Sequence, residues 1–536
     1  MGRDSVTLWR VATRATIPQG KARDFSPRWV PEGPSEWLIL LGIVVVAFMA
    51  RAVPVLRGAG LDGYLGYDDG VYFASAAAFV HGVVPYRDFL LLHPPGITVL
   101  LSPFALLGAA TDDSTGFAVA RVAFMLLGAV NTGLVLLCAG QYGRRAALFS
   151  GALYAVWYSA TRVEQTTQLL DPQTTFFLIG VLVLSWRRPV GVRRAAAGGA
   201  ALGIAVAIQL WEVVPLLIVV GTVALASRHT LGGWRRPALG LLAGAAAAFT
   251  VVCLPFLLAA PGEFVRFVLL DQLARPNLGV SIVTRLRDIE GLPSGGGRFQ
   301  SVLDAVVIGL AAVGAAAVAG VAWRVPAARI WCVLVVTETT YLLIAPVFFS
   351  HYSGWIAPAA AIVLGIGAAG IVGAADRHRL LAIGSRAGFV TIVGGLALAT
   401  ILRHQGIVLQ RADLERDIRG ARCVSADAPA LLLETSGLRR NLQAGCRLVL
   451  DPTGTSYDTD RGRLESGSVG ASRRGAPGYQ RAMEAYYGGS DAAMFTREAA
   501  DGLTAATRDA IARKLPVVVK RGSVTVMLPA VSASQR

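Results

Sequence analysis

The sequence predicts an α-helical polytopic membrane protein with about eleven transmembrane helices, followed by an extracytoplasmic α/β domain. Of the 536 residues, 54% are hydrophobic and only 16% are charged. The apolar runs are too long and too numerous for the core helices of a water-soluble protein. After residue 402 these runs stop, and short β-rich segments alternate with helical ones. We therefore divide the chain into an N-terminal arm (1–36), a membrane domain (37–402) and a C-terminal tail (403–536).

The arm is basic and is predicted to stay in the cytoplasm. It carries six cationic residues before the first apolar run: Arg3, Arg10, Arg14, Lys21, Arg23 and Arg28. This is unlike the short basic start of a cleaved signal peptide, so the first span is predicted to be retained. The net charge of +16 lies largely in this arm and in short basic loops. Membrane topology accounts for that charge, and no nucleic-acid partner is expected.

The predicted spans are apolar runs of roughly 20 residues, some of them shorter than ideal. They lie at 37–56, 117–140, 146–161, 174–186, 195–210, 213–226, 238–260, 302–322, 330–349, 354–374 and 387–402. The loops between them alternate in basic content, so every second loop is predicted to be cytoplasmic. Eleven crossings place the tail outside.

The first outer loop runs from Arg57 to about Gly116 and is predicted to contain two interfacial helices. The apolar stretch 96–110 is short and opens with Pro94-Pro95-Gly96. If it crossed the membrane, it would move the next basic loop to the wrong side, so we place it in the interface. The other interfacial helix is predicted to begin at Asp68.

The tail is predicted to be a small α/β domain. Its β-rich runs lie at 422–425, 447–450, 516–519 and 524–527, and its helical stretches include 428–435 and 478–487. Cys423 and Cys446 are its only cysteines. An oxidising exterior would allow them to form a disulfide, and two unpaired core cysteines are the alternative. The Gly/Ser/Arg-rich segment 458–477 is predicted to be a mobile loop, and no tail residue is predicted to be catalytic.

Acidic residues at the membrane surface are the candidates for chemistry. Asp68 and Asp69 stand at the start of the first predicted interfacial helix, and Asp171 opens a span in the second outer loop. Helix capping is the alternative role for Asp68 and for Asp171, which precedes a proline. A second acidic pair, Asp112-Asp113, lies in a Thr/Ser/Gly-rich turn and is interpreted as a helix start.

Three motifs together resemble the GT-C membrane glycosyltransferases. They are the acidic pair followed by Tyr72, the His93-Pro94-Pro95 that opens the second interfacial helix, and Leu170-Asp171-Pro172. The likeness is greatest to the branch with protein O-mannosyltransferases and lipid A aminoarabinose transferases. It is specific over residues 60–190, loose to about 400 and absent from the tail. Such enzymes pass a sugar from a polyprenyl phosphate to an acceptor hydroxyl at the outer face of the membrane.

The resemblance implies roles for the three aspartates. Asp68 matches the catalytic acidic position and would act as general base, with inversion at the anomeric carbon. Asp69 and Asp171 would orient the acceptor, the sugar or a bound cation. An oxygen-only site made of all three would suit Mg²⁺ or Mn²⁺ rather than zinc.

Further residues are predicted to bind the donor or acceptor: Tyr72, Arg87, His93, Glu212, Arg266, Arg275, His351 and Tyr352. The arginines would bind the donor phosphate, although solvation of an interfacial loop is their alternative role. Glu212 stands beside Trp211 where many relatives carry a Lys, and it is predicted to bind sugar hydroxyls. An interfacial Trp anchor with a solvated Glu is the alternative there.

The sequence thus predicts a glycosyltransferase of a bacterial plasma membrane that uses a polyprenyl-phosphate sugar in cell-envelope glycan, glycolipid or glycoprotein synthesis. A transporter or flippase for a lipid-linked precursor is the main alternative, because it too would need a polar cavity, outer arginines and the intramembrane Glu338. Repeated, interrupted spans typical of transporters are not evident in the sequence. A catalytically inactive scaffold is the third possibility.

Overall fold

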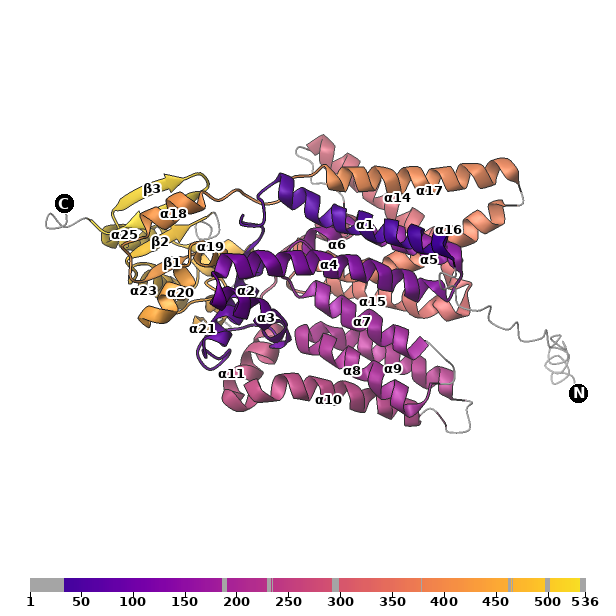
Figure 1. Cartoon of the computed structure of the whole chain (residues 1–536), viewed down its shortest axis with the longest axis horizontal. Helices are drawn as coiled ribbons and strands as arrows, with labels where there is room; N and C mark the ends of the chain where they lie inside the picture. The colour runs from indigo at the N-terminus through magenta and orange to yellow at the C-terminus, as the bar shows by residue number, and fades with distance from the viewer. Residues whose placement is uncertain are drawn as a thin grey trace, which may run out of the picture.

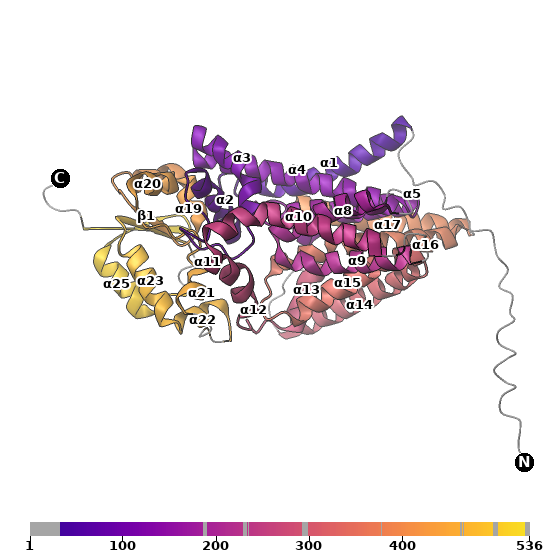
Figure 2. The ribbon, with the colours of Figure 1, turned by 90° about the horizontal axis from the view of Figure 1, so that it is seen from below.

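The computed structural model describes residues 33–185, 190–228, 233, 235–291, 298–376, 378–460, 464, 466–496 and 502–530. Residues 1–32, most of the predicted cytoplasmic arm, lie outside these described residues. A bundle of long helices forms most of the molecule, and the tail lies at one end of it (Figures 1 and 2). Both α1 and α17 begin at the far end of the bundle and finish beside the tail.

Each predicted apolar run coincides with helix in the bundle. The helices are α1 (Pro34–Arg57), α4 (Asp113–Gly140), α5 (Arg144–Ala155), α6 (Tyr158–Val163), α7 (Leu170–Ser185), α8 (Val192–Ile208), α9 (Val213–Ser227), α10 (Arg235–Ala259), α14 (Arg298–Trp323), α15 (Arg329–Ile344), α16 (Ala357–Ala375) and α17 (Arg379–Ile401). Short helical turns η1 (Leu210–Glu212), η3 (Pro326–Ala328) and η4 (Ser350–Ile356) precede α9, α15 and α16.

Eight helices among the described residues are long and apolar enough to cross a membrane. Large apolar side chains point outward from them, such as Val251 at 75% exposed and Leu258 at 70%. This is the arrangement expected where hydrocarbon, rather than water, surrounds the bundle. The predicted number of eleven crossings is not confirmed. The run 146–161 is broken between α5 and α6, and α7, with 16 residues, is short for a span.

The two helices of the first outer loop begin where the sequence predicts them. They are α2 (Tyr67–Val80) and α3 (Gly96–Ala110). Gly66 occupies the N-cap of α2, and no side chain caps this helix, so the structure does not use Asp68 as a cap. By contrast, Asp112 caps α4 by accepting from the Thr115 N–H at 3.0 Å, as predicted.

A later outer loop, between α10 and α14, is made of short helices. These are α11 (Pro261–Val265), the π-helical turn η2 (Arg266–Leu270), α12 (Asp271–Leu273) and α13 (Ile282–Glu290). Residues 274–281, between α12 and α13, are irregular and carry Arg275.

The tail contains a four-stranded sheet in the order β1-β2-β4-β3. Strand β1 (Val424–Ala426) is parallel to β2 (Ala492–Phe495), which is antiparallel to β4 (Val524–Leu528), and β4 is antiparallel to β3 (Val517–Arg521). The helices of the tail are α18 (Arg411–Asp417), α19 (Pro429–Glu434), α20 (Gly437–Ala444), α21 (Thr455–Thr459), α22 (Val469–Arg474), α23 (Pro477–Tyr487) and α25 (Ala505–Lys514).

Two predictions about the tail were wrong, and one strand was not predicted. The run 447–450 is irregular, because it anchors the chain through the buried Leu450 instead of pairing in the sheet. Strand β2 was missed, since Ala-Ala-Met-Phe has little β-branched character. The segment 458–477 contains the ordered helix α22 and is not simply a mobile loop.

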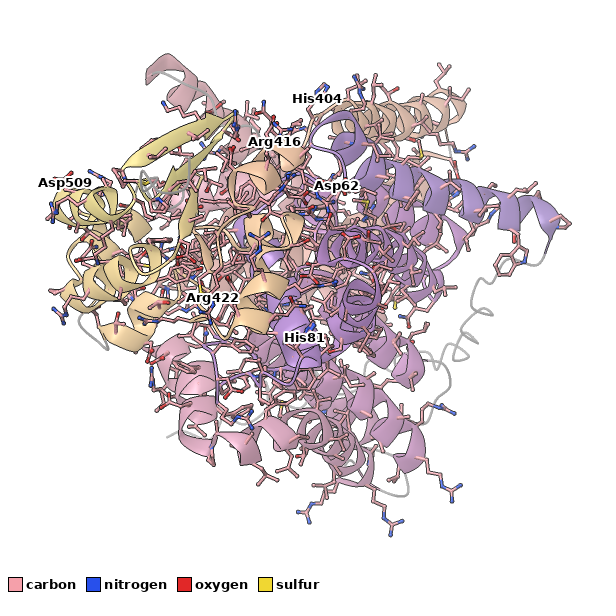
Figure 3. The ribbon with its side chains drawn as sticks, turned by 60° about the vertical axis from the view of Figure 1, so that its left-hand side comes forward. Asp62, His81, His404, Arg416, Arg422 and Asp509 are labelled. Atoms are coloured by element: carbon pink, nitrogen blue, oxygen red, sulfur yellow. A yellow bond between two sulfur atoms is a disulfide. The ribbon has the colours of Figure 1, made fainter. Side chains whose placement is uncertain are left out.

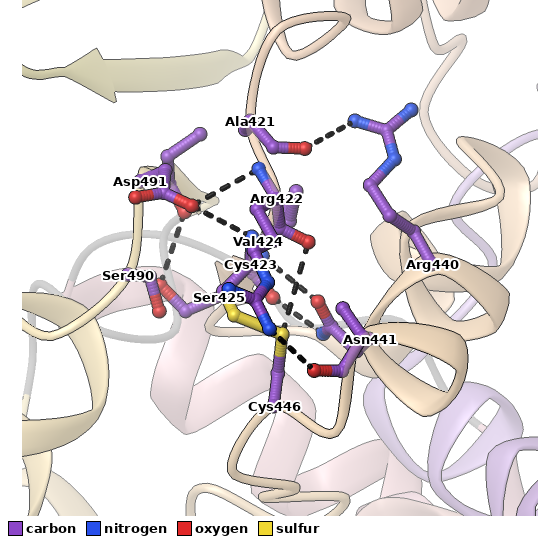
Figure 4. Close-up of a disulfide and its surroundings, with 12 residues drawn as sticks. Ala421, Arg422, Cys423, Val424, Ser425, Arg440, Asn441, Cys446, Ser490 and Asp491 are labelled. Atoms are coloured by element: carbon purple, nitrogen blue, oxygen red, sulfur yellow. Dashed lines mark hydrogen bonds between the residues drawn. A yellow bond between two sulfur atoms is a disulfide. The ribbon is translucent and has the colours of Figure 1, made fainter.

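The predicted disulfide forms between Cys423 and Cys446 (Figure 4). It joins the chain just before β1 to the end of α20. Asp491 accepts from the backbone N–H groups of Arg422 and Cys423, at 3.0 and 2.8 Å, on the other side of this strand. The first strand of the tail is therefore fixed from both sides.

The tail and the first outer loop share one hydrophobic core. Phe73, Ala77 and Phe117 from the membrane domain belong to the same buried cluster as Leu431 and Val526 from the tail. Figure 3, which turns the tail end forward, labels His81, the residue that follows α2, and Arg422 of the tail in the same part of the view. The tail is thus packed onto the outer loop and is not an independently tethered module.

Gly70 shows how closely the two parts approach. A Cβ built on this residue of α2 would lie 2.3 Å from the backbone nitrogen of Ala430 in α19. Only glycine leaves room for this contact.

Candidate active site

A narrow polar pocket lies where the first outer loop, the Arg275 loop, η4 and the tail meet. Its volume is about 70 Å³. Its polar and aromatic lining from the membrane domain is Asp68, Tyr72, His93, Arg275, Phe349, His351 and Tyr352. The lining from the tail is Asp451, Thr453, Gly454, Tyr457 and Arg473. The membrane domain and the tail therefore build a single site.

Asp68 provides the pocket's acidic group on the membrane side. It lies in the first turn of α2, where the helix dipole favours a negative charge. Its side chain is 33% exposed, and its Oδ2 is 3.5 Å from Nε2 of His351. The His351 ring stacks on Phe349 at a centroid distance of 5.6 Å, which fixes the imidazole beside the carboxylate. An accessible carboxylate with a neighbouring imidazole is a suitable proton acceptor.

Arg275 provides the positive charge opposite. Its Nη1 donates to the Tyr352 hydroxyl at 3.4 Å, and its guanidinium lies 5.3 Å from the ring centre of Tyr457. Burial works against its charge, but Tyr352 and Tyr457 outweigh that effect and raise the pKa of Arg275. Its Nε is buried without an acceptor among the described residues. A buried N–H donor without an acceptor is costly, so a cation that carries one favours the binding of an anionic ligand.

His93 is the neutral member of this group. Burial, followed by the charges of Arg275 and His351, lowers the pKa of His93 to about 3. Its ring makes an edge contact with Tyr72 at a centroid distance of 5.7 Å. At neutral pH His93 therefore contributes shape and a hydrogen-bonding nitrogen rather than charge.

Asp69 does not line the pocket. It is fully buried, accepts from Arg121 Nη2 at 2.6 Å and Nε at 3.0 Å, and accepts from the Thr167 N–H at 2.8 Å. Its oxygens are thus engaged in holding α2 against α4 and the start of α7. The predicted role of Asp69 in orienting a substrate is not supported by this placement.

Asp171 is also buried, in the first turn of α7, near Glu164 and Arg51. It does not line the pocket either. Asp68, Asp69 and Asp171 are therefore not brought together, and no group of three His, Cys, Asp or Glu residues suited to a metal ion occurs among the described residues. The donor set predicted for Mg²⁺ or Mn²⁺ does not fit this structure.

Three predicted substrate contacts lie elsewhere. Arg87 is exposed and pairs with Asp88 at 2.8 Å. Arg266 pairs with Glu263 at 2.5 Å and with Asp458 of the tail. These arginines are already neutralised by carboxylates, so they are poor candidates for the donor phosphate.

Glu212, the third of these residues, is buried and accepts from Trp355 Nε1 at 2.7 Å. Trp211 stacks on the same Trp355 with ring centres 5.2 Å apart. The pair belongs to an aromatic cluster behind Tyr352 and does not face the pocket. The predicted contact of Glu212 with sugar hydroxyls is not supported.

The tail residues of the pocket were missed by the sequence analysis. Asp451 Oδ1 accepts from the Tyr67 hydroxyl at 2.7 Å, and the same hydroxyl accepts from the Thr453 N–H at 2.8 Å. Burial, reinforced by Asp451, raises the pKa of Tyr67 well above its usual value, so Tyr67 remains a donor. The turn 451–454 is visible in the sequence, but nothing there connects it to α2.

A second tie between the tail and the membrane domain is ionic. Arg121 lies between Asp69 at 2.6 Å and Glu434 of α19 at 3.3 Å, and all three side chains are fully buried. Ser114 also donates to Glu434, at 2.7 Å. One cation thus faces two carboxylates, and burial raises the pKa of Glu434 to about 7 in spite of Arg121.

This raised pKa predicts how pH acts on the docking of the tail. The folded state holds the Glu434 proton more tightly than the unfolded state, so its contribution to stability is complete below about pH 4.5 and is lost as pH rises through about 7. The melting temperature of the native protein should fall relative to that of Glu434→Gln between pH 5 and 8. Thermal melting in detergent checks this, and parallel pH profiles would contradict it.

The comparisons with known proteins agree with this architecture. Residues 91–346, just under half of the chain, match the model of Glycosyltransferase family 87. The structure of the Archaeoglobus fulgidus oligosaccharyltransferase in complex with Zn and sulfate is similar with a TM-score of 0.52 at 12% identity, over 86% of this chain and 68% of that one. The chain has the fold of the GT-C membrane glycosyltransferases. The predicted resemblance is confirmed at this level.

Two other solved structures are similar to this chain. ArnT from Cupriavidus metallidurans bound to undecaprenyl phosphate gives a TM-score of 0.49 at 15% identity, over 93% of this chain and 99% of that one. The S. cerevisiae protein O-mannosyltransferase Pmt1-Pmt2 complex bound to the sugar donor gives 0.35 at 18% identity, over 44% and 35%. No curated protein matches the chain.

Proposed function

We propose that this chain, which has the GT-C fold, is a glycosyltransferase that moves a sugar from a polyprenyl-phosphate donor to an acceptor hydroxyl at the outer face of a bacterial plasma membrane. The observation that carries the proposal is a single pocket holding an accessible carboxylate, Asp68, and a guanidinium without a carboxylate partner among the described residues, Arg275. These are the two groups that the reaction needs, one to accept a proton and one to bind phosphate.

In the proposed reaction, the acceptor hydroxyl gives its proton to Asp68 while its oxygen attacks the anomeric carbon of the donor. The bond from that carbon to the phosphate oxygen breaks, and its electron pair leaves with the phosphate. Attack opposite the leaving group inverts the anomeric centre. A carboxylate is a weak base, so stabilisation of the leaving phosphate by Arg275 must supply much of the acceleration.

The surroundings of Arg275 suit a lipid carrier. The short helices that lead to it expose Leu269, Leu270 and Leu273, at 43%, 53% and 75%. Exposed leucines next to a phosphate-binding cation would let the prenyl chain stay in the bilayer while the phosphate enters the pocket. The pocket of about 70 Å³ is smaller than the ~300 Å³ of typical ligand sites, so we expect its walls to separate when the sugar binds.

The test is a donor panel. Purified full-length protein in proteoliposomes is mixed with labelled polyprenyl-phosphate sugars and with envelope extracts as acceptors, and release of free polyprenyl phosphate is measured. Release with one sugar, dependent on the extract, is the expected result. If no donor releases its phosphate while a lipid-linked sugar crosses between leaflets, the protein is a flippase and the proposal is wrong.

A metal requirement is a separate prediction. Since the three aspartates are apart, we propose that arginines rather than Mg²⁺ or Mn²⁺ balance the phosphate charge. Transfer should therefore be unchanged in millimolar EDTA. Loss of activity in EDTA that added Mg²⁺ or Mn²⁺ restores would show that a cation takes part.

A further inference from the structure

We propose that Arg473 of the tail binds the donor phosphate together with Arg275, so that the tail forms half of the catalytic site. This inference rests on the proposed function and extends it to a residue and a role that the sequence did not suggest. Both arginines line the same pocket, one from each part of the chain.

The segments that carry the two arginines are joined directly. The N–H of Gly467 in the tail donates to the carbonyl oxygen of Asn277, two residues after Arg275, at 2.8 Å. Tyr457 of the tail lies under the guanidinium of Arg275, and Asp458 pairs with Arg266 at the start of η2. The tail therefore determines where the Arg275 loop lies, as well as covering it.

Arg473 itself is held in place through its backbone. Its carbonyl oxygen accepts from Gln480 Nε2 at 2.8 Å and from the Ala476 N–H at 3.1 Å. The half-buried side chain lies beside Gly502, where a Cβ would be 3.4 Å from Arg473 Cδ. These contacts fix the backbone and the start of the side chain of Arg473, which is one of the residues that line the pocket.

Charge pairing separates Arg473 and Arg275 from the other outer arginines. Arg87 and Arg266 pair with neighbouring carboxylates. Within the described part of the chain, neither Arg275 nor Arg473 forms an ion pair with a carboxylate. Because no direct ion pair neutralises either guanidinium, the two groups in one pocket together attract an anion, and a lipid phosphate brings that charge.

Asp451 is the tail carboxylate in the same pocket, and its hydrogen bonds give it a different task. Its Oδ1 accepts from Tyr67, from the Thr453 hydroxyl at 3.0 Å and from the Gly454 N–H at 2.7 Å. Asp451 thereby fixes the loop that positions Tyr457. Asp451 is therefore a positioning residue for Tyr457 and Arg275. It does not compete with the phosphate for the two arginines.

Two arginines suit the chemistry of the leaving group. When the bond to the anomeric carbon breaks, the phosphate gains the electron pair and becomes more negative. A second guanidinium stabilises this added charge in the transition state and also binds the product. Removing Arg473 should therefore weaken product binding, raise the donor KM and lower kcat together.

The experiment measures binding of undecaprenyl phosphate, without sugar or acceptor, to the full-length protein in nanodiscs. The variants are Arg473→Gln and Arg473→Lys, with Arg474→Gln as the control, because Arg474 is the exposed neighbour on the same helix. Arg473→Gln should weaken binding by about tenfold or more, as expected for loss of one charge-assisted contact. Arg473→Lys should weaken it less, and Arg474→Gln should not change it.

Two results would overturn the inference, and they are distinguishable from a failure of the proposed function. If Arg473→Gln binds undecaprenyl phosphate like the native protein but raises the KM of the acceptor, Arg473 serves the acceptor. If Arg473→Gln and Arg474→Gln weaken binding equally, the effect is general surface charge. If the folded native protein itself does not bind undecaprenyl phosphate, the proposed function fails first. Melting curves show whether the tail stays docked, and Arg473→Lys provides the comparison if Arg473→Gln does not fold.

Discussion

Replacing Asp68 with Asn is expected to lower kcat for sugar transfer by about 10² to 10⁴-fold, the usual contribution of a general base. Asn has the shape of Asp but cannot accept the acceptor's proton. Because the Asp68 side chain is one-third exposed and caps no helix, the loss of its charge should leave the fold intact. The initial rate of polyprenyl phosphate release, measured with the donor that the panel identifies, checks the prediction.

The neighbouring aspartates provide matched controls for this change. Asp88→Asn, on the same loop but outside the pocket, should leave the transfer rate unchanged. Asp69→Asn should lower the melting temperature, because Asp69 pairs with buried Arg121. Equal transfer by Asp68→Asn and the native protein would remove Asp68 from the mechanism.

Replacing Arg121 with Met is expected to destabilise the protein by about 3 to 5 kcal/mol, the cost of breaking a buried ion pair by removing one partner. Asp69 would lose the cation with which it pairs, Glu434 would lose the same partner, and both carboxylates would stay buried. The guanidinium also lies 3.8 Å from the ring centre of Phe117, so packing is lost with the charge. Unfolding in mixed detergent micelles, followed by tryptophan fluorescence, measures the change.

A compensated variant tests the reason for this loss. In Arg121→Met combined with Asp69→Asn and Glu434→Gln, no buried charge remains at the junction. Much of the stability should return, since an uncompensated carboxylate is costlier than a neutral amide. If the triple variant is no more stable than Arg121→Met, packing against Phe117 rather than charge holds the tail to the bundle.

The two adjacent aspartates show what a sequence can and cannot resolve. The pattern located the reactive loop, the start of α2 and the presence of an acidic pair. It could not separate the roles of Asp68 and Asp69, because consecutive residues of a helix point about 100° apart and either could face a pocket. The position of Arg121 on α4, 52 residues later, decides that Asp69 is the buried partner.

For the predicted phosphate-binding arginines, too, the sequence located the candidates but could not choose between them. Composition and topology placed Arg87, Arg266 and Arg275 on the same side of the membrane, and all three were equally good candidates for binding the donor phosphate. Their difference lies in their partners: a carboxylate pairs with each of the first two, whereas the third contacts the tyrosines Tyr352 and Tyr457. Asp88 and Glu263 stand close by in the sequence, yet sequence distance alone does not establish that a pair forms.

The sequence by itself determined that this is a helical membrane protein, its long apolar helices, the two helices of the first outer loop, the tail disulfide and the membrane-side half of the site. These follow from local properties: hydrophobic length, helix starts, and motifs contained within a few residues of one another. Only the tertiary structure decided that the tail packs on α2 through Gly70, closes the pocket with Tyr457 and Arg473, and leaves Asp69 and Asp171 outside it. These outcomes depend on contacts between residues hundreds of positions apart, whose energies come from packing and burial that no local pattern encodes.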